Sequence, residues 1–192
     1  ELLRQLKPAC FEGEDHYGCF TPIELVDLGR SLYGSHASKE AIKLLLPRLA
    51  SPAFSRPETA CPATLLVARS YTKLRERKNS LPHYAAARTL CLDRSEEPDV
   101  LYFQGVDAFR QDRHKLALDA FMRLHQAYPE HSYNDDAILY EAAAMEAQGD
   151  RRAADALIRK GIERYPGGDM RQELGWRYVW STLKRGLMKQ SL

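Results

Sequence analysis

Apolar residues recur every three or four positions in the second half of the chain, with polar residues between them. Over residues 134–148 the apolar side chains fall at helical spacing (Ala137, Leu139, Tyr140, Ala143, Ala144 and Ala147). Ser132 precedes them as the expected N-cap, and Asp135 and Asp136 lie in the first turn, where the helix dipole favours negative charge. Gly149 can adopt the left-handed conformation that ends a helix. The pattern predicts a helix over residues 134–148.

A second helix is predicted to return along the first. Residues 152–165 carry Ala153, Ala156, Leu157 and Ile162 at helical spacing, and Pro166 stops the run because proline lacks a backbone donor. The alanines allow the paired helices to approach closely, so that each pair can pack its remaining apolar face on a neighbouring pair. We therefore predict an antiparallel helical hairpin.

The same pattern repeats along the chain. Tyr128-Pro129 recurs as Tyr165-Pro166 at a spacing of 37 residues, and Gly186, in Arg185-Gly186, follows Gly149, in Gly149-Asp150, at the same spacing. Gln111-Asp112 occupies the corresponding place one unit earlier. A period in the mid-thirties is typical of helical-hairpin repeats.

Further hairpins follow from the same rules. The predicted pairs are residues 22–33 with 38–50, 62–75 with 82–92, and 100–111 with 115–128, followed by a half pair at 170–185. Thr21 is the expected cap of the first helix, and Pro62 suits a first helical turn. The inner face of 115–128 is predicted from Ala117, Ala120, Phe121 and Leu124. No segment suggests a strand.

The predicted fold class is therefore all-α, a right-handed α-solenoid of tetratricopeptide-like (TPR-like) antiparallel helical hairpins. About four and a half hairpins fill residues 21–192, and residues 1–20 form an N-terminal segment.

The four cysteines fit two disulfide bonds. Cys61 and Cys91 lie equally far along the chain from a turn near residue 76, so an antiparallel pair brings them side by side. Cys10 and Cys19 flank a short loop with two glycines. We predict the bonds Cys10–Cys19 and Cys61–Cys91, which favour an oxidising compartment. The alternative is that Cys61 and Cys91 are small buried hydrophobic residues. A zinc site at Cys10, His16 and Cys19 lacks the paired short spacings of such sites.

Charge and hydropathy exclude two classes of partner. The chain has 28 Lys and Arg against 26 Asp and Glu, a formal net charge of +2, and no clustered basic face of the kind that nucleic acid requires. No apolar run reaches the roughly 18 residues that span a bilayer, so no transmembrane segment is expected. The sequence opens on Glu1 without Met, so we expect a mature or excised fragment whose targeting segment is missing.

The sequence predicts no catalytic residue, cofactor site or metal site. Asp135 and Asp136 are adjacent on a helix, where side chains point about 100° apart, so we expect them to diverge. The six histidines show no metalloprotease spacing. Gly167-Gly168 precedes a helix but lacks the strand and the Lys-Ser/Thr of a phosphate loop. Whether a parent protein is an enzyme stays open.

Five aromatic residues are candidates for ligand contact. Trp176, Tyr178 and Trp180 lie on the last predicted helix, and Tyr140 and Tyr102 lie at similar places on earlier helices. One interpretation is packing between repeats. The other is a ligand surface, because the first helices of such repeats line the concave face, where an aromatic ring can stack on a sugar or hold a peptide.

The chain resembles a known family over residues 98–186. The residues concerned are His131 to Ala137, Gly149-Asp150, Arg164-Tyr165-Pro166, Gly168-Asp169-Met170 and Leu174 to Trp180. They resemble the superhelical region of bacterial soluble lytic murein transglycosylases, and periplasmic TPR proteins share much of this rhythm. The family's catalytic domain has a Glu-Ser pair followed by Gly-Leu-Met-Gln. This chain has only Gly186-Leu187-Met188-Lys189, so the catalytic glutamate is not in these residues.

Three functions compete at this point. The resemblance implies a non-catalytic periplasmic scaffold domain that positions peptidoglycan glycan strands, or partners, for a catalytic domain outside this chain. The second is a free-standing periplasmic TPR-like adaptor that binds envelope proteins in assembly or division. The third, a cytosolic peptide-binding repeat protein, requires the four thiols to be free.

Overall fold

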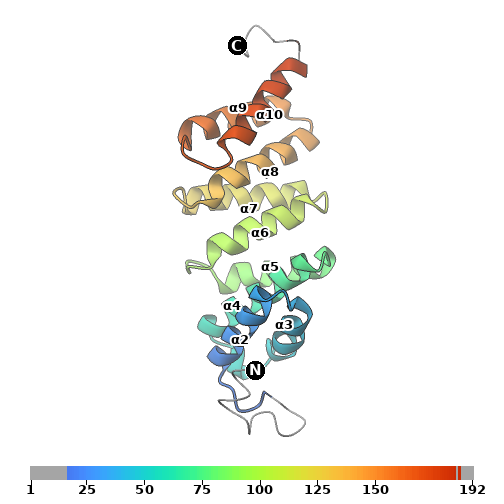
Figure 1. Cartoon of the computed structure of the whole chain (residues 1–192), viewed down its shortest axis with the longest axis vertical. Helices are drawn as coiled ribbons and strands as arrows, with labels where there is room; N and C mark the ends of the chain where they lie inside the picture. The colour runs from blue at the N-terminus through green and yellow to red at the C-terminus, as the bar shows by residue number, and fades with distance from the viewer. Residues whose placement is uncertain (1–16, 185, 187–192) are drawn as a thin grey trace. The chain divides into compact units, whose positions relative to one another are not determined.

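The regular structure of this protein is helical. The computed structural model describes residues 17–184 and 186, and within them every regular element is a helix (Figure 1). Contacts along the chain divide it into two compact units, Glu1–Glu96 and Glu97–Leu192, each built from antiparallel helical hairpins. The predicted all-α class is confirmed. None of the described helices combines the length and apolarity that crossing a bilayer requires.

The first unit contains two hairpins with two short 3-10 turns between them. Its elements are α2 (Pro22–Gly34), α3 (Ser38–Leu45), η2 (Leu46–Arg48), η3 (Pro52–Phe54), α4 (Pro57–Lys73) and α5 (Arg77–Leu90). Thr21 caps α2 as predicted, because its side chain accepts from the Glu24 amide while the Glu24 carboxylate accepts from the Thr21 amide. A buried apolar cluster joins α2, α3 and α4 (Phe20, Leu25, Val26, Leu44, Leu45, Phe54, Ala63, Leu66 and Val67).

The second unit contains two further hairpins and one more helix. Its elements are α6 (Glu97–Phe109), α7 (His114–Ala127), α8 (Tyr133–Ala147), α9 (Arg151–Arg164) and α10 (Arg171–Lys184). Figure 1 shows them stacked in chain order. The predicted inner face of α7 is confirmed, since Ala117, Ala120, Phe121 and Leu124 are all fully buried. A second cluster joins α8, α9 and α10 (Ile138, Ala142, Ala154, Ile158 and Leu174).

Each hairpin turns through one residue in the left-handed conformation. Four such residues lie after the first helix of a pair: His36, Arg75, Asp112 and Gly149, with φ of 63°, 61°, 57° and 90°. The last three are 37 residues apart, and Gly186, with φ of 71°, continues the series. In each pair the next residue donates its amide to a carbonyl five residues back, for example Asp150 to Met145 at 3.0 Å. This Schellman arrangement satisfies carbonyls that the helix end would otherwise leave without a donor.

Several predicted boundaries differ from the observed ones. Pro62 and Pro82 lie inside α4 and α5 rather than opening them, because Pro57 supplies the first-turn proline of α4 and α5 begins at the turn itself. The helix predicted over residues 38–50 ends at Leu45, and a 3-10 turn begins at Leu46, next to Pro47. Ser132 makes no side-chain cap, and His131 Nδ1 accepts the Tyr133 amide instead, at 3.2 Å.

The predicted bond Cys61–Cys91 is present. It joins the start of α4 to the end of α5 with a Cα–Cα distance of 5.0 Å, and both residues are fully buried. Cys19 is disulfide-bonded, but its predicted partner Cys10 lies outside the described residues, so the pairing Cys10–Cys19 stays a prediction.

Later hairpins have a different link at the same place. Cys91, Tyr128 and Tyr165 are 37 residues apart, each directly after the second helix of its pair. The Tyr128 hydroxyl donates to the Glu97 carboxylate at 2.6 Å, and that carboxylate is buried at the start of α6. The Tyr165 hydroxyl donates to the Pro129 carbonyl at 3.2 Å, just before α8. The open ends of these three hairpins are therefore held by bonds that differ from one repeat to the next.

The disulfide should contribute measurably to stability. Replacing both Cys61 and Cys91 by alanine should lower the free energy of unfolding by about 3 to 4 kcal/mol, because the bond closes a loop whose ends are 30 residues apart. Urea unfolding followed by circular dichroism measures this difference. Reduced wild-type protein should lose at least as much, because reduction also breaks the bond of Cys19. Equal stability of the variant and the oxidised protein would contradict the prediction.

The left-handed turn predicts opposite effects for one substitution at two glycines. Gly149→Ala should lower the free energy of unfolding by about 1 kcal/mol, since an L-residue is strained there although no atom lies near its Cβ position. Gly175→Ala, inside α10 and equally open, should instead raise it by about 0.5 to 1 kcal/mol. Thermal unfolding of both variants tests the pair, and two changes of the same sign would be inconsistent with this explanation.

Candidate functional site

The structure separates the five predicted aromatic residues into two groups. Three of them pack within the second unit. Tyr102 of α6 stacks on Tyr133 of α8, with ring centroids 4.4 Å apart. Tyr140 contacts the rings of Phe109 and Phe121, and Tyr178 of α10 packs on the cluster between α8 and α9. The packing interpretation accounts for the positions of these three, and a ligand role for them stays a prediction.

Trp176 and Trp180 project from α10 into solvent. Their rings stack with centroids 6.2 Å apart, and the two residues are 64% and 50% exposed. Lys184, one turn further on, lies with its Nζ 5.4 Å from the Trp180 ring. Two adjacent indoles exposed to this extent form an unusually apolar surface for a water-facing helix.

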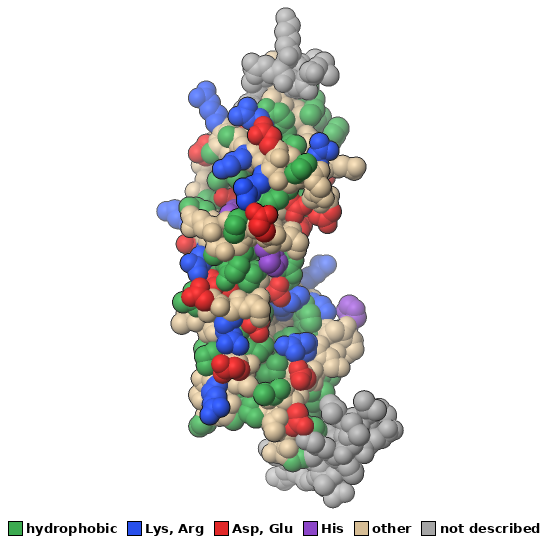
Figure 2. All heavy atoms as spheres, turned by 90° about the vertical axis from the view of Figure 1, so that its left-hand side faces the viewer, with side chains coloured by type: hydrophobic (Ala, Val, Ile, Leu, Met, Phe, Trp, Pro, Cys, Tyr) green, Lys and Arg blue, Asp and Glu red, His purple; other side chains and the backbone are tan. Residues whose placement is uncertain are grey.

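A basic hollow adjoins this tryptophan pair. It measures about 320 Å³ and is lined by Glu146, Arg151, Arg177, Trp180, Ser181 and Lys184. Arg177 is paired with Glu146 at 2.9 Å, so the other two cations leave the hollow with positive charge. On the face drawn in Figure 2, basic and acidic side chains are interspersed with apolar ones. The local excess of cations around Trp180 favours an acidic or electron-rich ligand.

An acidic cleft lies near the start of α8. It measures about 590 Å³, and its walls include Glu130, Tyr133, Asp135, Asp136 and Asp169. We expected Asp135 and Asp136 to diverge, but one oxygen from each lies within 4.8 Å of the other and of an Asp169 oxygen. The reason is tertiary, since the turn before α10 lies against the start of α8 and the Met170 amide donates to Asp135 at 3.2 Å. Carboxylate oxygens are ligands for hard cations, and three of them would supply only part of a Ca²⁺ shell.

The crowded carboxylates affect protonation nearby. Burial raises the pKa of Asp136, and the charges of Asp135 and Asp169 raise it further. The pKa of Tyr102 is also raised, first by burial and then by Asp136, so its hydroxyl remains neutral. The cleft therefore carries an electrostatic cost that the fold tolerates.

His125 links two helices through both of its ring nitrogens. Its Nδ1 lies 2.8 Å from Asn134 Oδ1 and its Nε2 lies 2.8 Å from Glu141 Oε2, so both ring nitrogens are engaged by α8. The Asn134 amide donates to the Tyr128 carbonyl at 2.7 Å, which leaves its oxygen to accept from His125. The side chain thus connects α7 to α8.

Sequence reasoning missed two elements of these sites. It did not associate Asp169 with Asp135 and Asp136, and it did not associate Arg151 and Lys184 with Trp180. An alignment of the repeats could have singled out the two tryptophans. Trp176 and Trp180 stand 37 residues after Leu139 and Ala143, so large aromatic side chains replace smaller ones there. The remainder depends on contacts between elements distant in sequence.

The architecture defines a TPR-like helical-repeat protein. The chain matches no protein-family model and no curated protein. Among solved structures it is similar to MamA from Desulfovibrio magneticus RS-1 (residues 41 to the end), with a TM-score of 0.71, 12% identity, and coverage of 89% of both chains. A MamA RS-1 double mutant gives a TM-score of 0.72 at 12% identity, covering 89% of this chain and 88% of that one.

A third neighbour agrees with these two. MamA of strain AMB-1 gives a TM-score of 0.69 at 15% identity, covering 89% of this chain and 86% of the other. Identities this low establish a shared fold alone. They support the TPR-like part of the sequence resemblance, and they give no support to its lytic transglycosylase part.

The acidic cleft predicts a pH-dependent stability difference. Because the pKa of Asp136 is higher in the folded than in the unfolded chain, its ionised form costs stability near neutral pH, and this cost disappears as the pH falls below the unfolded value. Asp136→Asn should therefore raise the melting temperature at pH 7 and have no stabilising effect near pH 3.5.

A matched control exists on α10. Glu173 also lies in a first helical turn but outside the carboxylate cluster, so Glu173→Gln should not stabilise the protein at pH 7. Melting curves of both variants between pH 3.5 and 8 provide the comparison. A destabilising Asp136→Asn at pH 7 would show that the helix dipole outweighs the crowding.

Proposed function

We propose that this chain is a non-catalytic TPR-like scaffold that binds a helical segment of a protein partner on the Trp176–Trp180 face of α10. The observation that supports this most directly is the exposed, stacked tryptophan pair at positions that earlier repeats use for contact with another helix.

The first helices of successive repeats present corresponding faces. Tyr102 and Val106 in α6 correspond to Trp176 and Trp180 in α10, two repeats later. In α6 this face is covered by α8, because Tyr102 stacks on Tyr133 and Val106 is only 6% exposed. The α10 face has the same place in the repeat, with larger aromatic side chains. A helix packed there would continue an interface that the fold already uses.

The chemistry of the face indicates what kind of helix fits. Two indoles supply the apolar centre of the contact, and tryptophan is among the residues that contribute most to binding at protein interfaces. Arg151 and Lys184 lie at the rim beside Trp180, so acidic residues flanking the apolar stripe of the partner would be favoured. The proposed partner segment is thus an amphipathic helix with acidic flanks.

The disulfide supports an oxidising compartment for this activity. Cys61 and Cys91 are bonded, and such bonds persist in secreted and periplasmic proteins rather than in the cytosol. This is the basis for proposing a periplasmic adaptor of the envelope over a cytosolic repeat protein.

A second candidate is the superhelical scaffold of a lytic transglycosylase, which would position glycan strands. It is favoured by the same tryptophan pair, because exposed aromatic rings can stack on sugar rings. Several residues that carry the sequence resemblance also have roles in the repeat itself. Gly149 takes the left-handed turn, and Tyr165 closes a hairpin. These roles explain such residues without the family, so we rank the adaptor first.

The tryptophan face can be tested by fluorescence. The sequence contains only two tryptophans, Trp176 and Trp180, so intrinsic tryptophan emission reports on this face alone. A photo-crosslinking residue at the neighbouring exposed position Gln172 would identify the partner segment, which is then synthesised and titrated. We expect a saturable blue shift and a loss of affinity of about tenfold or more in the double variant Trp176→Ala and Trp180→Ala, measured by calorimetry.

Matched variants and ligands separate the two candidates. Met122→Ala removes another exposed apolar side chain of the same unit and should leave affinity unchanged. N-acetylglucosamine oligomers serve as the glycan probe. A blue shift with these sugars and none with the peptide would favour the glycan scaffold, while emission that responds to neither would count against any role of this face in binding.

A further inference from the structure

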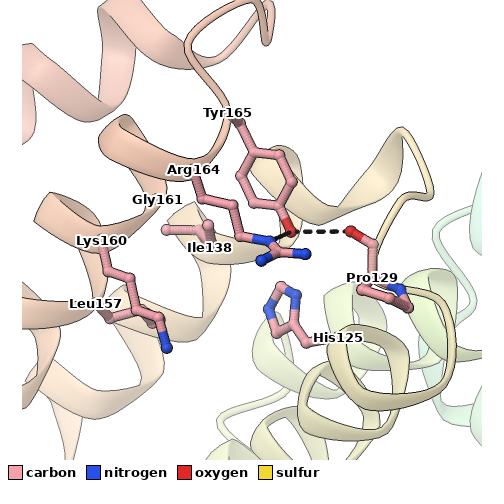
Figure 3. A pocket seen from close by; sticks show the side chains of 8 residues that line it. All are labelled: His125, Pro129, Ile138, Leu157, Lys160, Gly161, Arg164 and Tyr165. Atoms are coloured by element: carbon pink, nitrogen blue, oxygen red, sulfur yellow. Dashed lines mark hydrogen bonds between the residues drawn. The ribbon is translucent and has the colours of Figure 1, made fainter.

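A separate pocket lies between α7 and α9, on the second helices of two hairpins. It measures about 330 Å³ and is lined by residues of α7, α8 and α9 and of the segments that follow α7 and α9 (His125, Pro129, Ile138, Leu157, Lys160, Gly161, Arg164 and Tyr165). Figure 3 shows these side chains around the open space between α9 and His125. The volume is at the small end of the range for ligand sites, and suits one or two side chains of a bound segment.

One residue that lines the pocket departs from the repeat. Gly161 stands 37 residues after Leu124, whose side chain is fully buried in α7. Without a side chain at Gly161, Ile138 packs directly on the helix backbone, so that a Cβ added there would lie 2.6 Å from the Ile138 Cδ1. Ile138 therefore occupies the space that a side chain at position 161 would need, and with Leu157 it gives the pocket an apolar floor.

One wall of the pocket is fixed by hydrogen bonds. The Tyr165 hydroxyl donates to the Pro129 carbonyl at 3.2 Å and accepts from Arg164 Nε at 3.3 Å. His125 at the opposite side is held by Asn134 and Glu141. These bonds hold the pocket open without a ligand, which lowers the entropic cost of filling it.

The rim carries positive charge. Lys160 is exposed and, among the residues that the structure describes, has no hydrogen bond or ion pair. Arg164 is also at the rim, where it forms an ion pair with Glu130 at 3.1 Å. An apolar floor beneath an uncompensated cation is complementary to an apolar group joined to a carboxylate.

We propose that this pocket binds an acidic peptide segment, which inserts one aliphatic side chain over Ile138 and Leu157 and places a carboxylate at Lys160. The carboxylate could come from a glutamate or aspartate beside the inserted residue, or from a chain terminus. This site is on α7 to α9 and does not depend on the α10 face or on its proposed partner.

The test uses the whole chain and a set of matched capped peptides. The probe is an acetylated and amidated hexapeptide with a central leucine between two glutamates. Matched peptides replace the leucine by alanine, or the glutamates by glutamine, and a further peptide ends in leucine with a free carboxylate and no acidic side chain. Methyl NMR of Ile138 and Leu157 reports occupancy of the floor, and its titration gives the affinity.

We expect shifts of both methyl groups with the leucine and glutamate peptide, and weaker binding by the alanine and glutamine peptides. Lys160→Gln should weaken binding about three- to fivefold, as expected for one partly solvated ion pair. Arg159→Gln is the matched control, because Arg159 is an exposed cation of the same helix that does not line the pocket. It should bind like wild type.

The arms of the experiment also distinguish the source of the carboxylate. Binding of the free-terminus peptide alone would assign the site to a chain end, and binding of the glutamate peptide alone to an acidic side chain, and either result supports the proposal. The proposal would be overturned if the glutamine and glutamate peptides both bound, and with equal affinity. Equal effects of Lys160→Gln and Arg159→Gln, or no methyl shift with any peptide, would also overturn it.

Discussion

The geometry of each hairpin depends on a single left-handed residue between its two helices. The chain reverses at Arg75, Asp112 and Gly149, which are 37 residues apart. At each of them the amide of the next residue donates to the carbonyl five positions before it. Because this turn fixes where the second helix starts, it also fixes which side chains meet across the pair. Only one of these three positions is glycine. The packing of the two helices therefore compensates for the strain at the other two.

The opposite end of each hairpin is where the repeats differ. Cys91, Tyr128 and Tyr165 hold equivalent places, yet one forms a disulfide, one bonds a buried carboxylate and one bonds a carbonyl. The same contrast appears along the helices, where Gly161 replaces the leucine of the preceding repeat, lets Ile138 pack on the helix backbone and lines a pocket. The regular spacing of the repeats gives the fold, whereas the cavities and exposed faces that could bind a ligand lie where the side chains differ from repeat to repeat.

Much of the fold could be predicted from the sequence because its signals are local. Helical spacing, Gly149 and the two Tyr-Pro pairs locate the hairpins of the second unit to within a few residues. The predicted start of α4 at Pro62 was wrong, because Pro57 opens this helix and Pro62 lies inside it. The carboxylate cluster could not be predicted, since Asp169 reaches Asp135 only through the packing of a turn on α8. The exposed state of Trp176 likewise depends on which neighbouring helices cover α10.

The bond between Cys61 and Cys91 also has a mechanical consequence. A segment of 30 residues pulled straight would span roughly 100 Å, yet the bond holds its two ends with their Cα atoms 5.0 Å apart. A force applied along the chain would pass through the sulfur atoms and leave α4 and α5 unstretched. The hairpins closed by tyrosine have no such covalent bypass, so they would extend first. Under load, the tyrosine-closed hairpins would therefore extend while the segment between Cys61 and Cys91 kept its shape.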